Sequence, residues 1–300
     1  MSRTVEEDLF AYNDLDGFIR AFLAVQDMFD SVSDFNYVFD DLGTYLSDNG
    51  ITYCEAFFAP SAFLKKGFEY GQMVSLFSEK IAEIKRKHNC TVKLLLDVSR
   101  TFGCENALKN YELLKQFPCG DIIGIGLGGS EQKGPARDFE TVFTQAHRDG
   151  FHAVAHAGED TGPESVWDAI RLLHAERIGH GISCVQDQKL MQYLERTQLP
   201  LEICITSNVF TKKYVARTED HPVRKLFDSG IFVTINTDDP VFFHTTLLEE
   251  YWKCCSSLHF SLSDIKQLIC NSFTATFMDD AQKSDWISRV NAAWERAPEL

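Results

Sequence analysis

The stretch Phe151-His-Ala-Val-Ala-His-Ala-Gly-Glu-Asp160 joins an apolar, strand-like run to residue types suited to metal binding and proton transfer. If its first half is a strand, the alternation of side chains places His152 and His156 on the same face. Gly158 then permits a sharp turn that brings Glu159 back toward His156. Two interpretations follow: a reactive site at the carboxyl end of a buried strand, or a core histidine next to a helix-capping acid.

Strand-like and helix-like segments alternate on both sides of this stretch. Short apolar and β-branched runs are separated by segments in which apolar residues recur at helical spacing. The predicted strands are residues 51–60, 91–98, 121–129, 151–155, 177–179, 201–205 and 231–237, and the predicted helices are residues 15–29, 35–47, 71–88, 104–116, 139–149, 165–174, 187–197 and 222–229. Strands that are bounded by helices this regularly indicate a parallel sheet in an α/β protein.

Polar or catalytic residue types follow nearly every predicted strand. They are Glu55, Asp97, Gly129 with Glu131, His156 with Glu159, His180, Asn208, and Asp238 with Asp239. The carboxyl ends of the strands meet at one mouth in a closed barrel, whereas an open sheet places its site at a single crevice. We therefore predict a (β/α)8 TIM-type barrel that forms one domain over residues 1–300. Only seven strands are predicted, so one of the eight is missing, and the helix that begins near residue 15 leaves no room for it at the amino end.

Composition restricts the classes of partner. The chain has 300 residues, 44% hydrophobic and 24% charged, which fits a soluble protein with a large core. Its formal net charge of -15 argues against binding to nucleic acid or to an anionic membrane. Nine cysteines occur without a Cys-x-x-Cys pair, and we find no targeting signal or apolar run of roughly 18 residues. The cysteines are therefore expected to be reduced, and the protein to be cytoplasmic.

Four residues suited to hydrolysis lie at the ends of three predicted strands. His156 and Asp238 offer an imidazole and a carboxylate suited to zinc, whereas Glu159 and His180 can transfer protons. These residues can also be read as purely structural. His180 stands between two glycines, as in a turn, and Asp238-Asp239 before Pro240 resembles a helix start with capping carboxylates. We favour a reactive site, since unrelated caps have no reason to share one barrel mouth.

Four segments together resemble the metal-dependent adenosine deaminase family of the amidohydrolase superfamily. They are His156-Ala-Gly-Glu159, Arg177-Ile-Gly-His-Gly181, Thr206-Ser-Asn208 and Asn236-Thr-Asp-Asp-Pro240. The resemblance covers roughly residues 15–290 and also implies a TIM-type barrel. It implies zinc-dependent hydrolytic deamination of adenosine to inosine and ammonia, which belongs to purine metabolism.

The resemblance also implies a role for each of six residues. His156 and Asp238 would be zinc ligands, and Asp239 and the Gly129 amide would contact the purine. Glu159 would protonate the purine ring, and His180 would hold and deprotonate the attacking water. Zinc lowers the pKa of its water to about 7, so that hydroxide is available to attack the aminated ring carbon. The expected partner is a small aminopurine nucleoside, and the oligomeric state stays open.

The chain departs from the family pattern at its amino end. Family members begin with a His-x-His strand that supplies two further zinc ligands, and no His-x-His occurs among the nine histidines here. We expect a chain that starts at an internal methionine rather than a degenerate member, and we expect low zinc occupancy and little activity from this chain alone. Two alternatives to adenosine deamination stay open: deamination of adenine or aminodeoxyfutalosine, and a catalytically impaired purine-binding homologue. The glycine before His180 favours a nucleoside over a free base.

Three further residues have less specific interpretations. His152 is predicted to fill a lower layer of the barrel rather than to bind metal. His221, before Pro222, is predicted to mark the boundary between a loop and a helix, and Glu55 to offer a hydrogen-bonding group near the barrel mouth.

Overall fold

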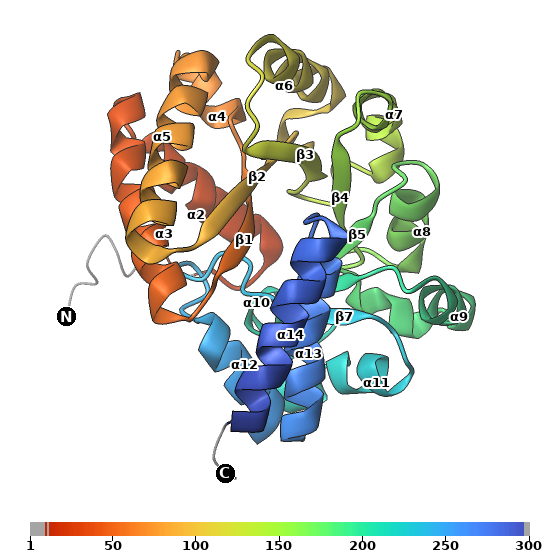
Figure 1. Cartoon of the computed structure of the whole chain (residues 1–300). Coiled ribbons are helices and arrows are strands. Elements are labelled where there is room, and N and C mark those ends of the chain that lie inside the picture. Colours follow the sequence, from red (N-terminus) through yellow and green to blue (C-terminus); the bar gives the residue numbers. More distant parts are fainter. Residues whose placement is uncertain (1–9, 11, 297–300) are drawn as a thin grey trace, which may run out of the picture. The chain divides into compact units, whose positions relative to one another are not determined.

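The computed structural model describes residue 10 and residues 12–296, and within them the chain divides into two compact units. The first unit comprises Met1–His156 with Asp168–Ala175, and the second comprises Ala157–Trp167 with Glu176–Leu300. Both contain parallel strands alternating with helices, as Figure 1 shows by its labels. None of the helices in the described part of the chain is long and apolar enough to span a membrane.

Parallel strands of the first unit pair in chain order. The strands are β1 (Tyr53–Phe58), β2 (Thr91–Asp97), β3 (Ile122–Leu127) and β4 (His152–Ala157). The helices are α2 (Leu15–Asp27), α3 (Phe35–Asp48), α4 (Ser61–Lys65), α5 (Tyr70–His88), α6 (Cys104–Gln116) and α7 (Glu140–Arg148), with short 3-10 turns η1 (Val32–Asp34), η2 (Arg100–Phe102) and η3 (Ala136–Phe139). This order is the repeated strand–helix–strand unit that the sequence pattern predicts.

Phenylalanine rings hold α3 and α5 against the sheet of the first unit. The ring of Phe77 on α5 lies 4.9 Å from that of Phe35, 5.1 Å from that of Phe39 and 5.1 Å from that of Phe58 on β1. Two of these pairs are edge-to-face, the arrangement that aromatic quadrupoles favour. The two helices consequently lie side by side (Figure 1).

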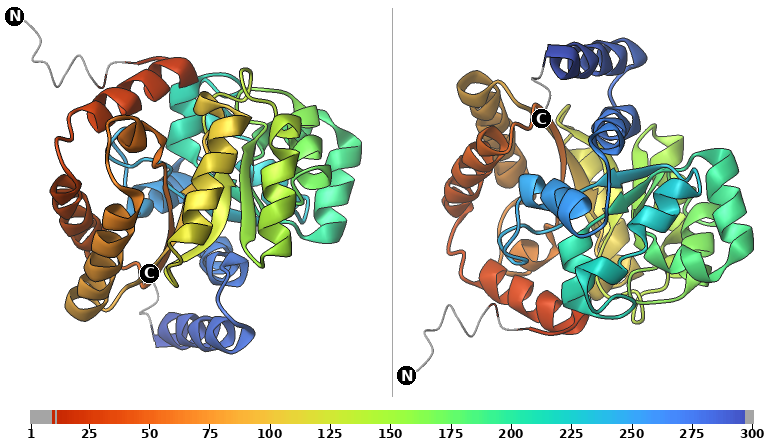
Figure 2. Two further views of the ribbon diagram at one scale, coloured as in Figure 1. Left: turned by 90° about the horizontal axis from the view of Figure 1, so that it is seen from above. Right: turned by 90° about the horizontal axis from the view of Figure 1, so that it is seen from below.

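Parallel strands of the second unit are shorter and also pair in chain order: β5 (Arg177–His180), β6 (Leu201–Ile203) and β7 (Val233–Ile235). The remaining helices are α8 (Pro163–Arg171), α9 (Gln188–Thr197), α10 (Ile205–Thr211), α11 (Val223–Asp228), α12 (Leu247–Ser256), α13 (Leu262–Ala275) and α14 (Asp280–Arg296), with 3-10 turns η4 (Ile182–Gln186) and η5 (Thr218–Asp220). The helices α13 and α14 pack together (Figure 2) through stacked rings of Phe273 and Trp286, whose centroids are 5.4 Å apart.

A buried arginine links three segments of the second unit. Arg177, at the start of β5, donates from Nε to Glu202 on β6 at 2.7 Å and from its guanidinium to the Ala275 carbonyl at 3.0 Å. Its guanidinium also lies 3.9 Å from the centre of the Phe277 ring. A charge in a core needs such partners, because desolvation of an unpaired ion costs several kcal/mol. Arg177 therefore ties the strands that carry the site to the end of α13.

The alternation predicted from the sequence is confirmed, and every predicted strand and helix is present with ends shifted by a few residues. One segment differs. The predicted strand 201–205 ends at Ile203, and α10 begins at Ile205, so Thr206-Ser-Asn208 follows the strand as predicted but lies on a helix. A distant residue stabilises the first turn of this helix, since the buried carboxylate of Glu250 accepts from the Thr206 amide at 3.1 Å. The extent of the domain over residues 1–300 stays a prediction.

Candidate active site

Two of the predicted site residues occupy an unusual backbone conformation. His180 is the last residue of β5 and has φ 63°, and Asp238, after β7, has φ 58°. Side chains other than glycine rarely adopt this left-handed region, because Cβ crowds the following carbonyl. Residues 238–244 form bends and turns, and the next helix, α12, begins at Leu247 with Thr246 as its cap. The interpretation of Asp238 as a helix cap is therefore wrong.

An imidazole and two carboxylates meet in the second unit. His180 Nε2 lies 3.4 Å from Glu159 Oε2 and 3.9 Å from Asp238 Oδ2. The side chains of His180 and Glu159 are buried, and that of Asp238 is largely so. Ser207 on α10 donates from Oγ to Asp238 Oδ2 at 2.7 Å, which fixes the orientation of that carboxylate. Groups that can exchange protons or bind a cation are thus brought together from four segments of the chain.

The turn that carries Glu159 is held by close packing. Gly158 has φ 70°, and a Cβ built on it would lie 2.4 Å from Ser183 Oγ and 2.6 Å from Val166 Cγ2. The Ser183 amide donates to the Gly158 carbonyl at 3.0 Å. Glu159 precedes α8, which starts only at Pro163, so it lies outside that helix rather than within its first turn. Glycine is required here by both its conformation and the space available.

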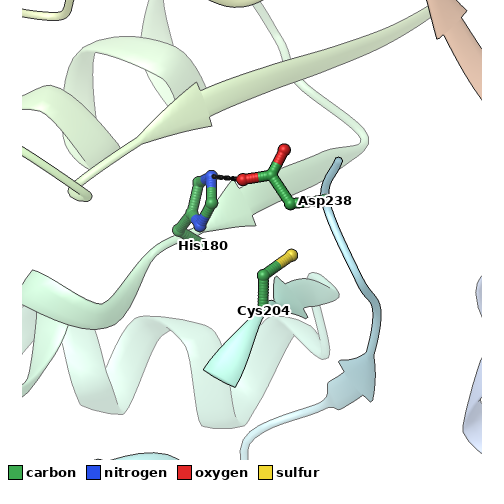
Figure 3. A group of neighbouring side chains, drawn as sticks. All are labelled: His180, Cys204 and Asp238. Atoms are coloured by element: carbon green, nitrogen blue, oxygen red, sulfur yellow. Dashed lines mark ion pairs between the residues drawn. The ribbon is translucent and has the colours of Figure 1, made fainter. Parts of the chain in front are cut away.

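Cys204 joins His180 and Asp238 in a cluster that the sequence did not single out. One donor atom from each residue lies within 4.8 Å of the others (Figure 3). Nitrogen, sulfur and oxygen donors all bind zinc, at about 2.0–2.3 Å, so small movements would bring these atoms onto one ion. The donor set therefore fits a divalent metal. Cys204 directly follows β6, and its place at a strand end was the available signal.

The electrostatic surroundings of Cys204 are acidic. Burial raises the pKa of the thiol well above its ordinary value, and the nearby carboxylates of Asp238 and Glu250 raise it further. Without a cation the sulfur consequently carries its proton. A coordinated thiol, in contrast, is deprotonated by the ion itself.

Two other buried residues form a hydrogen-bonded chain with His180, in which Asn208 contacts His180 and His221 contacts Asn208. Asn208 Nδ2 lies 3.1 Å from His180 Nδ1, and Asn208 Oδ1 lies 3.2 Å from His221 Nε2. The amide of Val223 donates to His221 Nδ1 at 3.1 Å, so His221 also satisfies the first turn of α11. His221 thus marks a loop-to-helix boundary, as predicted, but its other nitrogen faces the site. We call His180, Asn208 and His221 the histidine relay.

The helix that carries Asn208 is anchored by α12. Glu250 is fully buried and accepts hydrogen bonds from the Thr206 amide at 3.1 Å and from Thr245 Oγ1 at 2.7 Å. The ammonium of Lys253 lies 2.9 Å from the same carboxylate and compensates its charge. A buried carboxylate with this many partners holds α10, and therefore Asn208, in a fixed orientation.

Two other predicted site residues, His156 on β4 and Gly129 after β3, belong to the first unit. A Cβ on Gly128 would lie 3.0 Å from His156 Nδ1 and 2.9 Å from Asp97 Oδ2, so these three residues share one location. Asp97 accepts from the amides of Gly128 at 2.9 Å and Ser99 at 2.8 Å. Burial raises the pKa of Asp97, and these two hydrogen bonds oppose the increase. Gly129 itself has φ 99°, which glycine adopts without strain.

The predicted roles of all six site residues remain predictions, including proton transfer by Glu159 and His180 and the purine contact of Gly129. The use of both His156 and Asp238 as ligands of one metal ion is untested, because the two residues belong to different units. Asp239 is half-buried in the turn after β7, and its role as a purine contact is likewise untested. Glu55, predicted to offer a hydrogen-bonding group, accepts from the Tyr53 hydroxyl at 2.9 Å within β1.

Comparison with known proteins places the chain in a family. Residues 4–293 match the adenosine deaminase family. The chain is 32% identical over 293 residues to an aminodeoxyfutalosine deaminase of Streptomyces avermitilis, covering 96% of this chain and 81% of the relative. It is 34% identical over 286 residues to an adenine deaminase of Crocosphaera subtropica, covering 93% of this chain and 86% of the relative.

Solved structures show the same fold. An adenine deaminase from Arthrobacter aurescens matches with a TM-score of 0.92 and 27% identity over 97% of this chain and 88% of that one. An amidohydrolase from Burkholderia ambifaria with bound zinc matches with a TM-score of 0.88 and 20% identity, covering 92% of this chain and 78% of that one. The predicted fold class, an α/β TIM-type barrel, is thereby confirmed, with seven strands among residues 12–296 rather than eight.

The family match, the deaminase relatives and the buried histidine and carboxylates agree with one another. Deaminases of this superfamily depend on a metal ion, and the His180, Cys204 and Asp238 donor set is compatible with one. The chain belongs to the adenosine deaminase family and is a hydrolase that acts on carbon–nitrogen bonds of cyclic amidines.

Proposed function

We propose that the protein catalyses hydrolytic deamination of a 6-aminopurine compound, with adenine or aminodeoxyfutalosine favoured over adenosine. The observation that carries the proposal is the buried contact between His180 and Glu159, 3.4 Å apart, beside Asp238. Relatives at 30% identity or more are named adenine deaminase or aminodeoxyfutalosine deaminase. These names support the alternatives to adenosine better than adenosine itself.

Glu159 is the proposed proton donor. An aromatic amine is a poor electrophile, and a proton placed on the neighbouring ring nitrogen makes the aminated carbon easier to attack. Glu159 is buried next to an imidazole, in a position where water is largely excluded. In the balanced reaction, water adds its oxygen to the ring carbon and gives one proton to a base of the site, while the ring nitrogen takes a proton from Glu159. The amino group then takes the proton that water gave up, its bond to the ring carbon breaks and ammonia leaves. The added hydroxyl becomes a carbonyl and returns its remaining proton to Glu159.

The remaining residues hold the reactants. His180 holds the attacking water, Asp239 and the Gly129 amide contact the purine, and His156 and Asp238 hold a divalent metal, with the Cys204 sulfur close enough to Asp238 to act as a further donor. We propose that this ion is zinc. When bound, zinc would lower the pKa of a water molecule to about 7. The protein residues orient the water and deliver the proton.

A substrate panel tests the proposal. We would measure ammonia release from adenine, adenosine and aminodeoxyfutalosine, each with and without added zinc. We expect turnover of adenine or aminodeoxyfutalosine to exceed that of adenosine, and added zinc to raise it. Purine binding without ammonia release under both conditions would contradict the proposal and favour the impaired purine-binding homologue. Full zinc occupancy and rapid turnover without added metal would instead contradict only the expected weak zinc binding.

A further inference from the structure

We propose that Asn208 and His221 are positioning residues, which together fix the proton of the neutral His180 ring on Nε2. In this tautomer His180 presents an N–H donor to the carboxylates of the site, rather than a lone pair. The inference rests on the proposed function only for its catalytic consequence, because the tautomer is a property of the protein without substrate.

The histidine relay begins at a group that can act only as a hydrogen-bond donor. The backbone amide of Val223 can only donate, and its nitrogen lies 3.1 Å from His221 Nδ1. Nδ1 of His221 must therefore carry a lone pair. Burial lowers the pKa of His221 to about 3, so the ring is neutral at pH 7. A neutral imidazole with a lone pair on Nδ1 has its proton on Nε2.

That proton determines the orientation of Asn208. His221 Nε2 lies 3.2 Å from Asn208 Oδ1, which accepts its proton. A side-chain amide has one accepting end and one donating end, so the Nδ2 group must face the other way. Asn208 Nδ2 lies 3.1 Å from His180 Nδ1 and donates to it. His180 Nδ1 consequently accepts, and the proton of this ring is left on Nε2.

The opposite tautomer would disturb every bond of the relay. A proton on His180 Nδ1 would turn the Asn208 amide round and place its NH₂ group against His221 Nε2. The His221 proton would then move to Nδ1, where it would face the Val223 amide, and two donors would oppose each other. Water cannot relieve this conflict, because His180, Asn208 and His221 are only 2%, 1% and 3% exposed. Buried donors without acceptors are strongly disfavoured.

The relay changes the chemistry expected of His180. With Nδ1 accepting from Asn208 and Nε2 protonated, neither ring nitrogen has a lone pair left for a metal ion, so this tautomer takes His180 out of the donor set and leaves Cys204 and Asp238. The His180 Nε2–H faces Glu159 Oε2 at 3.4 Å and Asp238 Oδ2 at 3.9 Å. A donor in this place holds an attacking oxygen by hydrogen bonding and cannot remove its proton. Removal of the proton from water then falls to one of the two carboxylates that face the ring. This differs from the role as a base that the family resemblance implies.

Nuclear magnetic resonance tests the inference directly. The full chain would be labelled with ring-¹⁵N histidine, and long-range ¹H–¹⁵N correlations at pH 7 without substrate identify which ring nitrogen carries the proton. We expect the Nε2–H tautomer for both His180 and His221. In Asn208→Asp the donating end becomes a second acceptor, so the His180 ring should gain a proton on Nδ1. The matched control is Asn271→Asp, whose Nδ2 donates to the Val233 carbonyl at 2.9 Å, and it should leave the His180 signals unchanged.

Two results would overturn the inference: a wild-type His180 protonated on Nδ1, or an Asn208→Asp variant in which the proton stays on Nε2 alone. If this variant does not fold, the wild-type spectrum still decides the tautomer. In active protein, Asn208→Leu should lower kcat about 10-fold or more with little change in KM, as loss of an outer partner of a site histidine usually does. Absence of deamination together with the Nε2–H tautomer would contradict the proposed function and leave the relay standing.

Discussion

Nε2 of His180 lies 3.4 Å from Oε2 of Glu159, and both side chains are buried. The two residues reach this contact from different segments, because β5 ends at His180 while Glu159 lies in the turn after β4. A carboxyl group and an imidazole held this close in a site shielded from water interact strongly, since the surrounding dielectric constant is low. The proposed deamination depends on this pair.

Glu159→Gln should reduce catalysis without loss of the fold. Glutamine keeps the shape and one hydrogen-bonding oxygen but cannot deliver a proton, and general acid catalysis contributes about 10²–10⁴ in rate. We expect kcat to fall by about that factor while KM changes little. The control is Glu164→Gln on α8, an exposed glutamate outside the site. A variant at position 159 with normal kcat would remove Glu159 from the mechanism.

His221 should make the protein sensitive to acid. Burial lowers its pKa in the folded state from 6.5 to about 3, so between these values the unfolded chain binds a proton that the folded chain does not. Stability therefore falls as pH decreases through this window, by about 1.4 kcal/mol per pH unit for one proton. Between pH 6.5 and 5 the wild type should lose about 2 kcal/mol more than His221→Gln. Urea unfolding at each pH measures the difference, and parallel stability curves for the two proteins would contradict it.

Gly158→Ala should destabilise the turn that carries Glu159. The new Cβ would lie 2.4 Å from Ser183 Oγ and 2.6 Å from Val166 Cγ2, at φ 70°. Overpacking of this kind costs about 1–3 kcal/mol, and adding Ser183→Ala should restore part of that loss in a double-mutant cycle. Gly162→Ala is the matched control, because nothing lies within 4 Å of a Cβ there. Equal effects of the two alanines on the unfolding free energy would refute the packing argument.

Two arginines with similar partners should contribute differently to the free energy of unfolding. Arg177 pairs with Glu202 and lies over the Phe277 ring in the core, whereas Arg289 pairs with Asp285 at 2.8 Å and lies over the Trp286 ring. The side chains of Arg289 and Asp285 are 61% and 57% exposed. Arg177→Ala should cost about 3 kcal/mol, because it leaves the carboxylate of Glu202, only 18% exposed, without this partner.

Arg289→Ala should cost at most about 1 kcal/mol, since exposed ion pairs contribute little. Thermal or urea unfolding of the two variants provides the comparison. A loss at position 289 as large as that at position 177 would show that burial is not the deciding factor.

The sequence was sufficient for the order of strands and for most of the candidate site. Strand–helix alternation is a local pattern, and His156, Glu159, His180 and Asp238 stand out because each follows an apolar run. Local patterns do not reveal α10, because the residue that fixes its first turn, Glu250, lies 44 positions after Thr206. The histidine relay depends on the position of Asn208 on that helix, so it could not be predicted from the sequence. Cys204 was not singled out, because a cysteine in an apolar run is typical of a core thiol and only its position at a strand end marks it.

The left-handed backbone at His180 and Asp238 predicts which substitutions would follow a loss of catalysis. Each position costs about 1 kcal/mol or more relative to glycine, so a chain selected for folding alone would gain stability by replacing both residues with glycine. Here both positions keep side chains that chemistry can use. In a relative that no longer catalyses deamination, we therefore expect glycine at these two positions.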